Sequence, residues 1–278
     1  MAFDAEAIRA EFPILQRQVN GKPLVYLDSA ASAQKPRAVI EAMTRAMEHS
    51  YANVHRGLHT LANETTEAYE GARQKVAAFI GADPSEIVFT KGGTEAINLV
   101  ASGLGATLKA GDEILLSEME HHANIVPWHF LRERQGVVLK FTPVTDDGRL
   151  DVEAFKALLT ERTRVVALTH MSNVLGSVNP VTELTRLAHD AGAVVLLDGC
   201  QAIVHQPIDV KALDVDFYVF SGHKLYGPTG IGALYGKSER LADLRPYQGG
   251  GEMIGTVTLE AISYADPPHR FEAGTPPI

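Results

Sequence analysis

The sequence has little of what several classes of protein require. Its 278 residues include one cysteine, Cys200, so no disulfide can form within the chain and a reducing compartment fits. No apolar run approaches the roughly 18 residues that cross a bilayer. The first residues lack the basic start and apolar stretch of a signal peptide. The net charge of -9, without a sustained basic run, argues against binding nucleic acid or an anionic membrane. We expect a soluble, cytoplasmic protein.

Short apolar runs alternate with amphipathic stretches along the chain, without an internal repeat. This alternation is typical of crossover units that feed a mostly parallel sheet between two helical layers. We therefore expect a three-layer α/β/α domain. The expected strands of its seven-stranded sheet are 86–90, 113–117, 137–142, 164–169, 193–198, 217–221 and 232–235. The expected helices include 64–80, 94–104, 152–159 and 182–191. Residues 24–28 read as a further strand, followed by a small-residue loop at 29–32 that can approach a ligand closely.

A lysine next to a histidine marks the segment 221–227, Ser-Gly-His-Lys-Leu-Tyr-Gly, directly after an apolar run. A lysine at the end of a buried strand is costly unless its amine is neutral, paired or covalently bound. Asp198 ends another apolar run, 194–197. Alone, Lys224 fits a solvated loop and Asp198 fits a strand-end turn. Together they are typical of a pyridoxal phosphate (PLP) site, where the lysine forms a Schiff base and the aspartate pairs with the pyridine nitrogen.

A glycine-containing loop at 91–93 lies between an expected strand and an expected helix. The helix N-terminus offers free N–H groups to an anion, Gly93 lets the backbone come close, and the Thr94 hydroxyl adds a donor. Such a loop is also found as an ordinary tight turn. Ser221 and His223, on either side of Lys224, can both contact the same phosphate.

His121 follows the expected strand 113–117. An imidazole at a strand end can lie on a cofactor ring and transfer protons. A metal site is the alternative, because His122 and His129 are close in sequence. These histidines lack the spacing of a helical zinc pair and have no clustered third ligand, so we expect no metal.

The segment 198–201, Asp-Gly-Cys-Gln, follows the expected strand 193–198. In an extended segment the side chains of Asp198 and Cys200 point the same way. Asp198 can then reach the ring nitrogen and keep it protonated, while Cys200 presses on the ring face and Gln201 donates toward the phenolic oxygen. We expect Cys200 to be a buried apolar contact whose pKa is raised, and not a nucleophile.

Several longer motifs resemble those of group II cysteine desulfurases of the sulfur-mobilisation type, in the class V aminotransferase family of PLP fold type I. The resemblance covers the whole chain. The motifs are Tyr-Leu-Asp-Ser-Ala-Ala-Ser-Ala-Gln-Lys-Pro at 26–36, Val-His-Arg-Gly at 54–57 with His-Thr-Leu at 59–61, Glu-His-His-Ala-Asn-Ile-Val-Pro-Trp at 120–128, Ser-Asn-Val-Leu-Gly at 172–176, 221–232, and Arg-Phe-Glu-Ala-Gly-Thr-Pro at 270–276.

The resemblance implies a role for each candidate residue. The implied catalytic residues are Lys224 and His121. Lys224 forms the Schiff base and acts as the base at the substrate α-carbon, and His121 stacks on the cofactor ring and acts as an acid or base. The implied cofactor-binding residues are Gly93, Thr94, His121, Asp198, Cys200, Gln201, Ser221, His223, Lys224 and Thr275, the last reaching the phosphate of a partner subunit. Ala30 and Asn173 are the implied substrate-binding residues. Residues 1–20 would belong to a small domain and 21–278 to the PLP-binding large domain.

The implied activity is conversion of L-cysteine to L-alanine, with the sulfur passed to an enzyme cysteine as a persulfide. A homodimer and a sulfur-acceptor protein of iron–sulfur cluster assembly are the implied partners. Selenocysteine lyase, another class V lyase or transaminase, and a non-catalytic PLP-binding scaffold or fragment are the alternatives.

Two departures from the family pattern matter. The family usually has alanine at the position of Cys200. Its persulfide cysteine and the arginine that binds the substrate carboxylate follow the Gly-Thr-Pro motif, where this chain stops at Ile278. We therefore expect the C-terminal small domain to be missing, and this chain alone to be inactive in sulfur transfer.

Overall fold

The computed structural model describes residues 3–278, and a seven-stranded sheet runs through its centre. The strands lie in the order β3-β9-β8-β7-β6-β4-β5. Their bounds are β3 Ile87–Thr90, β4 Glu113–Ser117, β5 Val138–Thr142, β6 Thr163–Thr169, β7 Val194–Asp198, β8 Phe217–Ser221 and β9 Gly232–Gly236. All seven expected strands are therefore confirmed, within two residues at each end.

The sheet is mostly parallel, as expected. Neighbouring pairs from β5 to β8 are parallel, whereas β9 is antiparallel to both β8 and β3. Apolar side chains alternate between the two faces. On β7, Val195 and Leu197 face one core while Leu196 faces the other. A strand buried on both faces has to be apolar throughout, which is why these runs are visible in the sequence.

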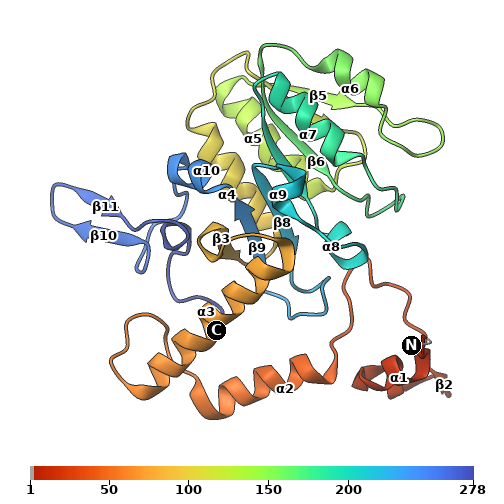
Figure 1. The fold of residues 1–278 in the computed structure, drawn as a ribbon, viewed down its shortest axis with the longest axis vertical. Helices are drawn as coiled ribbons and strands as arrows, with labels where there is room; N and C mark the ends of the chain where they lie inside the picture. Colours follow the sequence, from red (N-terminus) through yellow and green to blue (C-terminus); the bar gives the residue numbers. More distant parts are fainter. Residues whose placement is uncertain (1–2) are drawn as a thin grey trace.

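Helices cover both faces of the sheet, which gives the expected three layers (Figure 1). One core lies under α3 (Thr60–Ile80), α6 (Val152–Leu158), α7 (Val181–Asp190), α8 (Ala202–His205) and α9 (Val210–Leu213). The other lies under α4 (Gly93–Gly105), α5 (Val126–Gln135) and α10 (Ser238–Asp243). The four expected helices are confirmed as α3, α4, α6 and α7, with α3 beginning one turn earlier.

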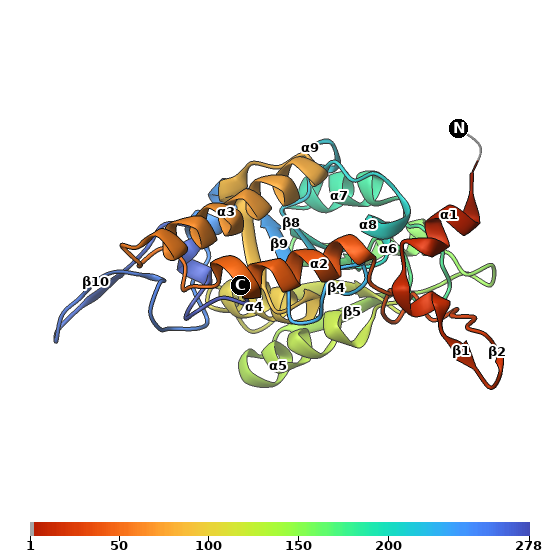
Figure 2. The ribbon, with the colours of Figure 1, turned by 90° about the horizontal axis from the view of Figure 1, so that it is seen from below.

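The N-terminal part lies beside the sheet (Figures 1 and 2). It contains α1 (Ala5–Ala10), η1 (Pro13–Gln16), the short strands β1 (Gln18–Val19) and β2 (Lys22–Pro23), α2 (Arg37–Arg45) and η2 (Ala46–Ser50). Neither α1 nor α2 buries a residue within the described part of the chain. The expected division at residues 20 and 21 stays a prediction.

The expected strand at 24–28 is wrong. These residues are irregular in the structure, although Leu24 N donates to Arg17 O at 3.0 Å. Val25 and Leu27 are 74% and 91% exposed. The apolar residues of this segment are therefore not buried against any part of residues 3–278. The segment that follows is nevertheless the expected loop of small residues.

A hairpin of β10 (Ile254–Val257) and β11 (Ile262–Tyr264) projects away from the body of the molecule (Figures 1 and 2). Its apolar side chains at Val257, Leu259 and Ile262 are exposed. After the hairpin, the short turn η5 (His269–Phe271) brings the chain back to the sheet through the buried Phe271. Within residues 3–278, none of the helices is long and apolar enough to span a bilayer.

The parallel register places the ends of neighbouring strands at one edge of the sheet. Thr169 of β6 is opposite Asp198 of β7, which is opposite Val219 of β8. The residues that follow these strands therefore lie close together, although they are far apart in sequence. In open α/β sheets, ligands bind outside this edge.

Two glycine-to-alanine substitutions test the packing at this edge against a matched site. A Cβ on Gly199 would overlap the buried ring of Tyr218, whereas a Cβ on Gly71, inside α3, meets nothing within 4 Å. Gly199→Ala should lower the free energy of unfolding by about 1–3 kcal/mol because it overpacks the core. Gly71→Ala should raise it by about 0.4–1 kcal/mol. Urea denaturation measures both, and equal effects of the two substitutions would contradict this packing.

Candidate active site

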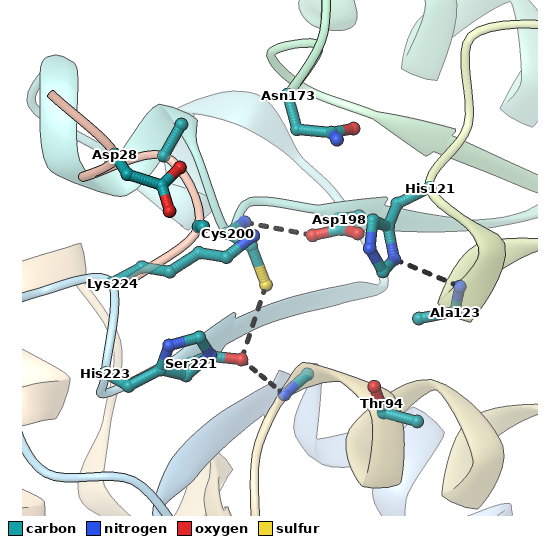
Figure 3. A pocket seen from close by; sticks show the side chains of 13 residues that line it. Asp28, Thr94, His121, Ala123, Asn173, Asp198, Cys200, Ser221, His223 and Lys224 are labelled. Carbon is teal, nitrogen blue, oxygen red and sulfur yellow. Dashed lines mark hydrogen bonds between the residues drawn. The ribbon is translucent and has the colours of Figure 1, made fainter. Parts of the chain in front are cut away.

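A cavity of about 480 Å³ lies at this edge of the sheet (Figure 3). Its volume is within the usual range for a small-molecule site. It is lined by Asp28, Ala30, Ala31, Gly93, Thr94, His121, Ala123, Asn173, Asp198, Cys200, Ser221, His223 and Lys224. Loops after four strands and the start of α4 thus contribute to one site.

Lys224 enters this cavity from the loop after β8. The loop closes on itself, because Gly222 N donates to Ile231 O at 2.9 Å and Gly227 N donates to Gly222 O at 2.9 Å. The residues directly after the small-residue loop hold the loop after β8 in place. Ala33 N donates to His223 O at 3.0 Å, and Lys35 Nζ donates to the same oxygen at 3.1 Å. Lys224 and His121 enter from opposite sides of the cavity (Figure 3).

Asp198 ends β7 near the middle of the sheet and is 6% exposed. Its Oδ1 accepts a hydrogen bond from Cys200 N at 3.0 Å, and its carbonyl oxygen accepts one from His170 N at 2.9 Å. Among residues 3–278, no side chain or backbone group donates to Oδ2. A buried carboxylate with one free oxygen beside a cavity is suited to a cationic or N–H donor of a ligand.

The N-terminus of α4 also lines the cavity, through Gly93 and Thr94. Gly93 N donates to Ser221 Oγ at 2.8 Å, which ties the start of the helix to the end of β8. A Cβ on Gly93 would come 2.8 Å from Cys200 Sγ, and one on Gly232 would come 2.5 Å from Gly92 Cα. These glycines therefore permit the close approach. The helix N-terminus, with the Thr94 and Ser221 hydroxyls and the His223 ring, is suited to bind a phosphate.

His121 has a defined tautomer in this structure. Its Nδ1 accepts a hydrogen bond from Ala123 N at 3.1 Å, so the neutral ring carries its proton on Nε2. Burial lowers the pKa of His121, and the positive charge of Lys224 lowers it further. The ring is therefore neutral at pH 7 and can donate or accept a proton at Nε2.

Cys200 is buried between Asp198 and Ser221, with its Sγ 3.7 Å from Ser221 Oγ. Burial raises the pKa of the thiol well above its usual range, and the nearby Asp198 carboxylate raises it further. The thiolate, which is the nucleophilic form, is therefore suppressed. This environment is the one that the sequence led us to expect.

The structure brings most of the expected site residues together. Lining the cavity are Ala30, Gly93, Thr94, His121, Asn173, Asp198, Cys200, Ser221, His223 and Lys224. Gln201 lies behind the lining, because its Nε2 donates to Ala30 O at 2.8 Å and so holds the small-residue loop in place. Thr275 lies outside the cavity, in a hollow that Glu95 and Glu272 also line. The roles expected of these residues stay predictions.

Three lining residues were missed by the sequence analysis, namely Asp28, Ala31 and Ala123. Asp28 and Ala31 are neighbours of Ala30 in the loop motif at 26–36, and Ala123 is part of the motif that contains His121. Their motifs were recognised. Their orientation was not, because it depends on how the irregular loops fold.

A second group of titratable side chains lies away from the cavity. The ligand atoms of His55, Glu70 and His269 lie within 4.8 Å of one another, so they are spaced like metal ligands. The Glu70 carboxylate is already bound, however. Arg73 Nε donates to it at 2.8 Å, and His55 Nε2 lies 2.9 Å from its Oε1. The contact between His55 and Glu70 ties the loop at residue 55 to α3, and the ion pair between Arg73 and Glu272, directly after η5, ties the C-terminal end of that turn to the same helix.

Residues 25–278 match the model of the class-V aminotransferase family. The chain belongs to this family. A cysteine desulfurase of Dickeya dadantii is 58% identical over 99% of this chain and 68% of its own length. The crystal structure of the cysteine desulfurase CsdA from Escherichia coli is 46% identical, with a TM-score of 0.91, over 100% of this chain and 69% of that one.

A third similar structure is that of a mutant of the cystine C–S lyase C-DES, with glycine covalently linked to its PLP cofactor. It is 26% identical to this chain, with a TM-score of 0.83, and the match covers 96% of this chain and 69% of that one. The PLP fold type I that we expected is thus confirmed. This chain spans about two thirds of the length of these three similar proteins.

The cavity of this class V chain fits PLP. The free oxygen of Asp198 is placed for a protonated pyridine nitrogen, the start of α4 for a phosphate, and the Lys224 amine for the carbonyl carbon. A PLP site combines covalent attachment to a lysine with a phosphate site at a helix N-terminus. The residues present therefore supply all three contacts.

The buried environment of Cys200 predicts slow reaction with thiol reagents. At pH 8, iodoacetamide should alkylate the folded chain at least about tenfold more slowly than the chain unfolded in urea, because the thiolate is suppressed. The chain has no other cysteine, so mass spectrometry reads this site alone. Equal rates in the folded and unfolded chain would show that Cys200 is accessible and reactive.

Proposed function

We propose that this protein is a PLP-dependent cysteine desulfurase that converts L-cysteine to L-alanine. The observation that carries the proposal is the arrangement of Lys224, the free oxygen of Asp198 and the N-terminus of α4 around one cavity. The names of the similar class V proteins support the choice of substrate. When bound, PLP supplies an electron sink for the bonds at the substrate α-carbon.

In this proposal, three side chains of the cavity have different roles in the reaction. Lys224 attaches the cofactor and later takes the proton from the substrate α-carbon. His121 exchanges a proton at its Nε2, which carries the hydrogen in the neutral ring. Asp198 keeps the pyridine nitrogen protonated, because a buried carboxylate stabilises an adjacent cation.

The remaining lining residues position the two ends of the ligand. Thr94, Ser221 and His223 bind the phosphate, together with the backbone of Gly93. Asn173, in the loop after β6, binds the substrate carboxylate in this proposal, and Ala30, in the small-residue loop, also contacts the substrate; that both residues line the cavity supports these roles. Gln201 supports this side of the cavity through its hydrogen bond to the Ala30 carbonyl.

The sulfur acceptor in this proposal is a thiol outside the 278 residues. In desulfuration a thiolate takes the substrate sulfur as a persulfide, the bond between Cβ and sulfur breaks, and its electron pair stays with Cβ, which gains a proton on the way to L-alanine. Cys200 is poorly suited to this step, because burial raises its pKa and it packs against Ser221. We further propose that the persulfide passes to an acceptor protein of iron–sulfur assembly in the cytoplasm.

Attachment of PLP to Lys224 can be tested directly. The chain incubated with PLP should show a visible absorption band, and borohydride reduction should fix the label on the peptide that contains Lys224. Lys224→Ala should abolish the reducible label, whereas Lys91→Ala, at an exposed lysine near α4, should keep it. Label on another lysine, or none at all, would overturn the proposed function.

We also propose that the protein forms a homodimer. Support comes from apolar side chains on the outside of the described chain, at Met43 and Met47 around η2 and at Leu259 on the projecting hairpin. A mostly apolar hollow of about 340 Å³ is lined by Ala46 and Ser50 of η2 and includes Tyr51 and Tyr69. Surfaces of this kind mark sites of protein association.

The dimer should be visible in solution. Light scattering should give twice the mass of the chain, and changing Met47 and Leu259 together to glutamate should shift the protein to the monomer by placing charge in the interface. As a control, Phe3→Glu changes an exposed apolar residue at the far N-terminal end and should leave the mass unchanged. A monomeric wild-type chain at all concentrations would contradict the proposal.

A further inference from the structure

A buried carboxylate, that of Glu120, lies directly before His121 in the sequence. Glu120 follows β4, is 7% exposed and is not among the residues that line the cavity. Its Oε1 accepts hydrogen bonds from Ser117 Oγ at 2.5 Å and from Thr169 N at 2.9 Å. Its Oε2 accepts one from Asn124 Nδ2 at 2.7 Å. The Glu120 carboxylate has no role in the reaction proposed above.

These hydrogen bonds join the segment that carries His121 to the sheet on both sides. Ser117 is the last residue of β4, and Thr169 is the last residue of β6, opposite Asp198. Asn124 belongs to the short turn η4 (His122–Asn124), and its Oδ1 accepts a hydrogen bond from Trp128 Nε1 at 3.1 Å. One carboxylate thus fixes both ends of the loop that contains His121.

The geometry of this network suits the ionised form of Glu120. The amide groups of Asn124 and Thr169 can only donate to it, and a protonated carboxyl would have to find its acceptor in the Ser117 hydroxyl alone. Burial raises the pKa of Glu120 and the nearby Asp198 adds to this, whereas the three hydrogen bonds lower it, and the balance is a pKa of about 7. Ionisation therefore depends on all three donors.

The same loop sets the tautomer of His121. Asn124 N donates to His121 O at 2.8 Å, which makes the turn in which Ala123 N points at His121 Nδ1. If Asn124 moves, this turn opens, and Ala123 N no longer donates to His121 Nδ1. The ring then loses the contact that keeps its proton on Nε2. Glu120 controls Asn124 through the hydrogen bond to Oε2.

We propose that Glu120 is a positioning residue for His121, whose orientation and Nε2–H tautomer it sets through Asn124 and the turn at 122–124. The proposal rests on the function proposed above, in which His121 exchanges a proton at Nε2. Glu120 touches neither substrate nor cofactor. Its carboxylate acts only through the hydrogen bonds that hold the loop.

The test is the tautomer of His121, measured by long-range 1H–15N NMR of the imidazole in the cofactor-free chain and again with PLP bound. A His121→Gln variant assigns the signal. In the wild type, Nε2 should be protonated and Nδ1 should not. Glu120→Gln replaces one accepting oxygen with an NH2 group, so a donor faces either Asn124 Nδ2 or Thr169 N and the loop is released at one end. The two nitrogens of His121 should therefore shift toward the average of both tautomers. Hydrogen exchange at the Ala123 amide should become at least about tenfold faster.

Glu113→Gln is the matched control, because Glu113 is a buried carboxylate at the other end of β4, bonded to Lys140 and Arg162. It should leave the His121 signals unchanged. Ser117→Ala removes one donor while keeping the negative charge, and it should shift the His121 signals in the same direction but less.

Unchanged His121 signals in folded Glu120→Gln would overturn the proposal. If that variant does not fold, unchanged signals in Ser117→Ala would do so. A wild-type chain that forms no visible band with PLP would instead refute the proposed function. The tautomer of His121 is also measured without PLP, so the role of Glu120 is tested independently of that result.

Discussion

The parallel pairing of β4, β6, β7 and β8 is the constraint on which the site depends. Because these strands run in the same direction, their carboxyl ends meet at one edge, and the loops that follow converge there. His121, Asp198 and Lys224 each follow or end one of these strands. A shift of β7 by one residue would turn Asp198 to the other face and move Val195 and Leu197 out of their core. The hydrophobic core and the cavity are thus fixed by the same register.

The buried polar groups behind the cavity form a second layer. The Asp198 carbonyl binds His170 N, Gln201 holds the Ala30 loop, and Glu120 holds the turn beside His121. Burial lowers the pKa of His170 to about 4, so this ring is neutral and adds no charge behind Asp198. The negative charge of Asp198 therefore faces the cavity without a cationic partner behind it at this position. A low-dielectric setting makes the charge more effective toward a ligand.

Much of the fold could be predicted from the sequence, because strands buried on both faces need unbroken apolar runs, as in Val194–Asp198. The strand expected at 24–28 failed for the same reason, since Val25 and Leu27 look like buried residues but are exposed. The projecting hairpin of β10 and β11 gave no such signal, because its residues are not part of the core. At the site, Lys224 and Asp198 could be found from their strand ends. The orientation of Asp28 and the hydrogen bond from Gln201 to Ala30 depend on contacts between distant loops, which no local pattern encodes.

The proposed function depends above all on a contact between the free oxygen of Asp198 and the pyridine nitrogen of PLP. The most direct measurement is 15N NMR of PLP labelled at that nitrogen and bound to the chain, compared between wild type and Asp198→Asn. The account predicts a protonated nitrogen in the wild type, because the carboxylate stabilises the pyridinium, and an unprotonated one in the variant. An unprotonated nitrogen in the wild type, or the same signal in both proteins, would contradict it.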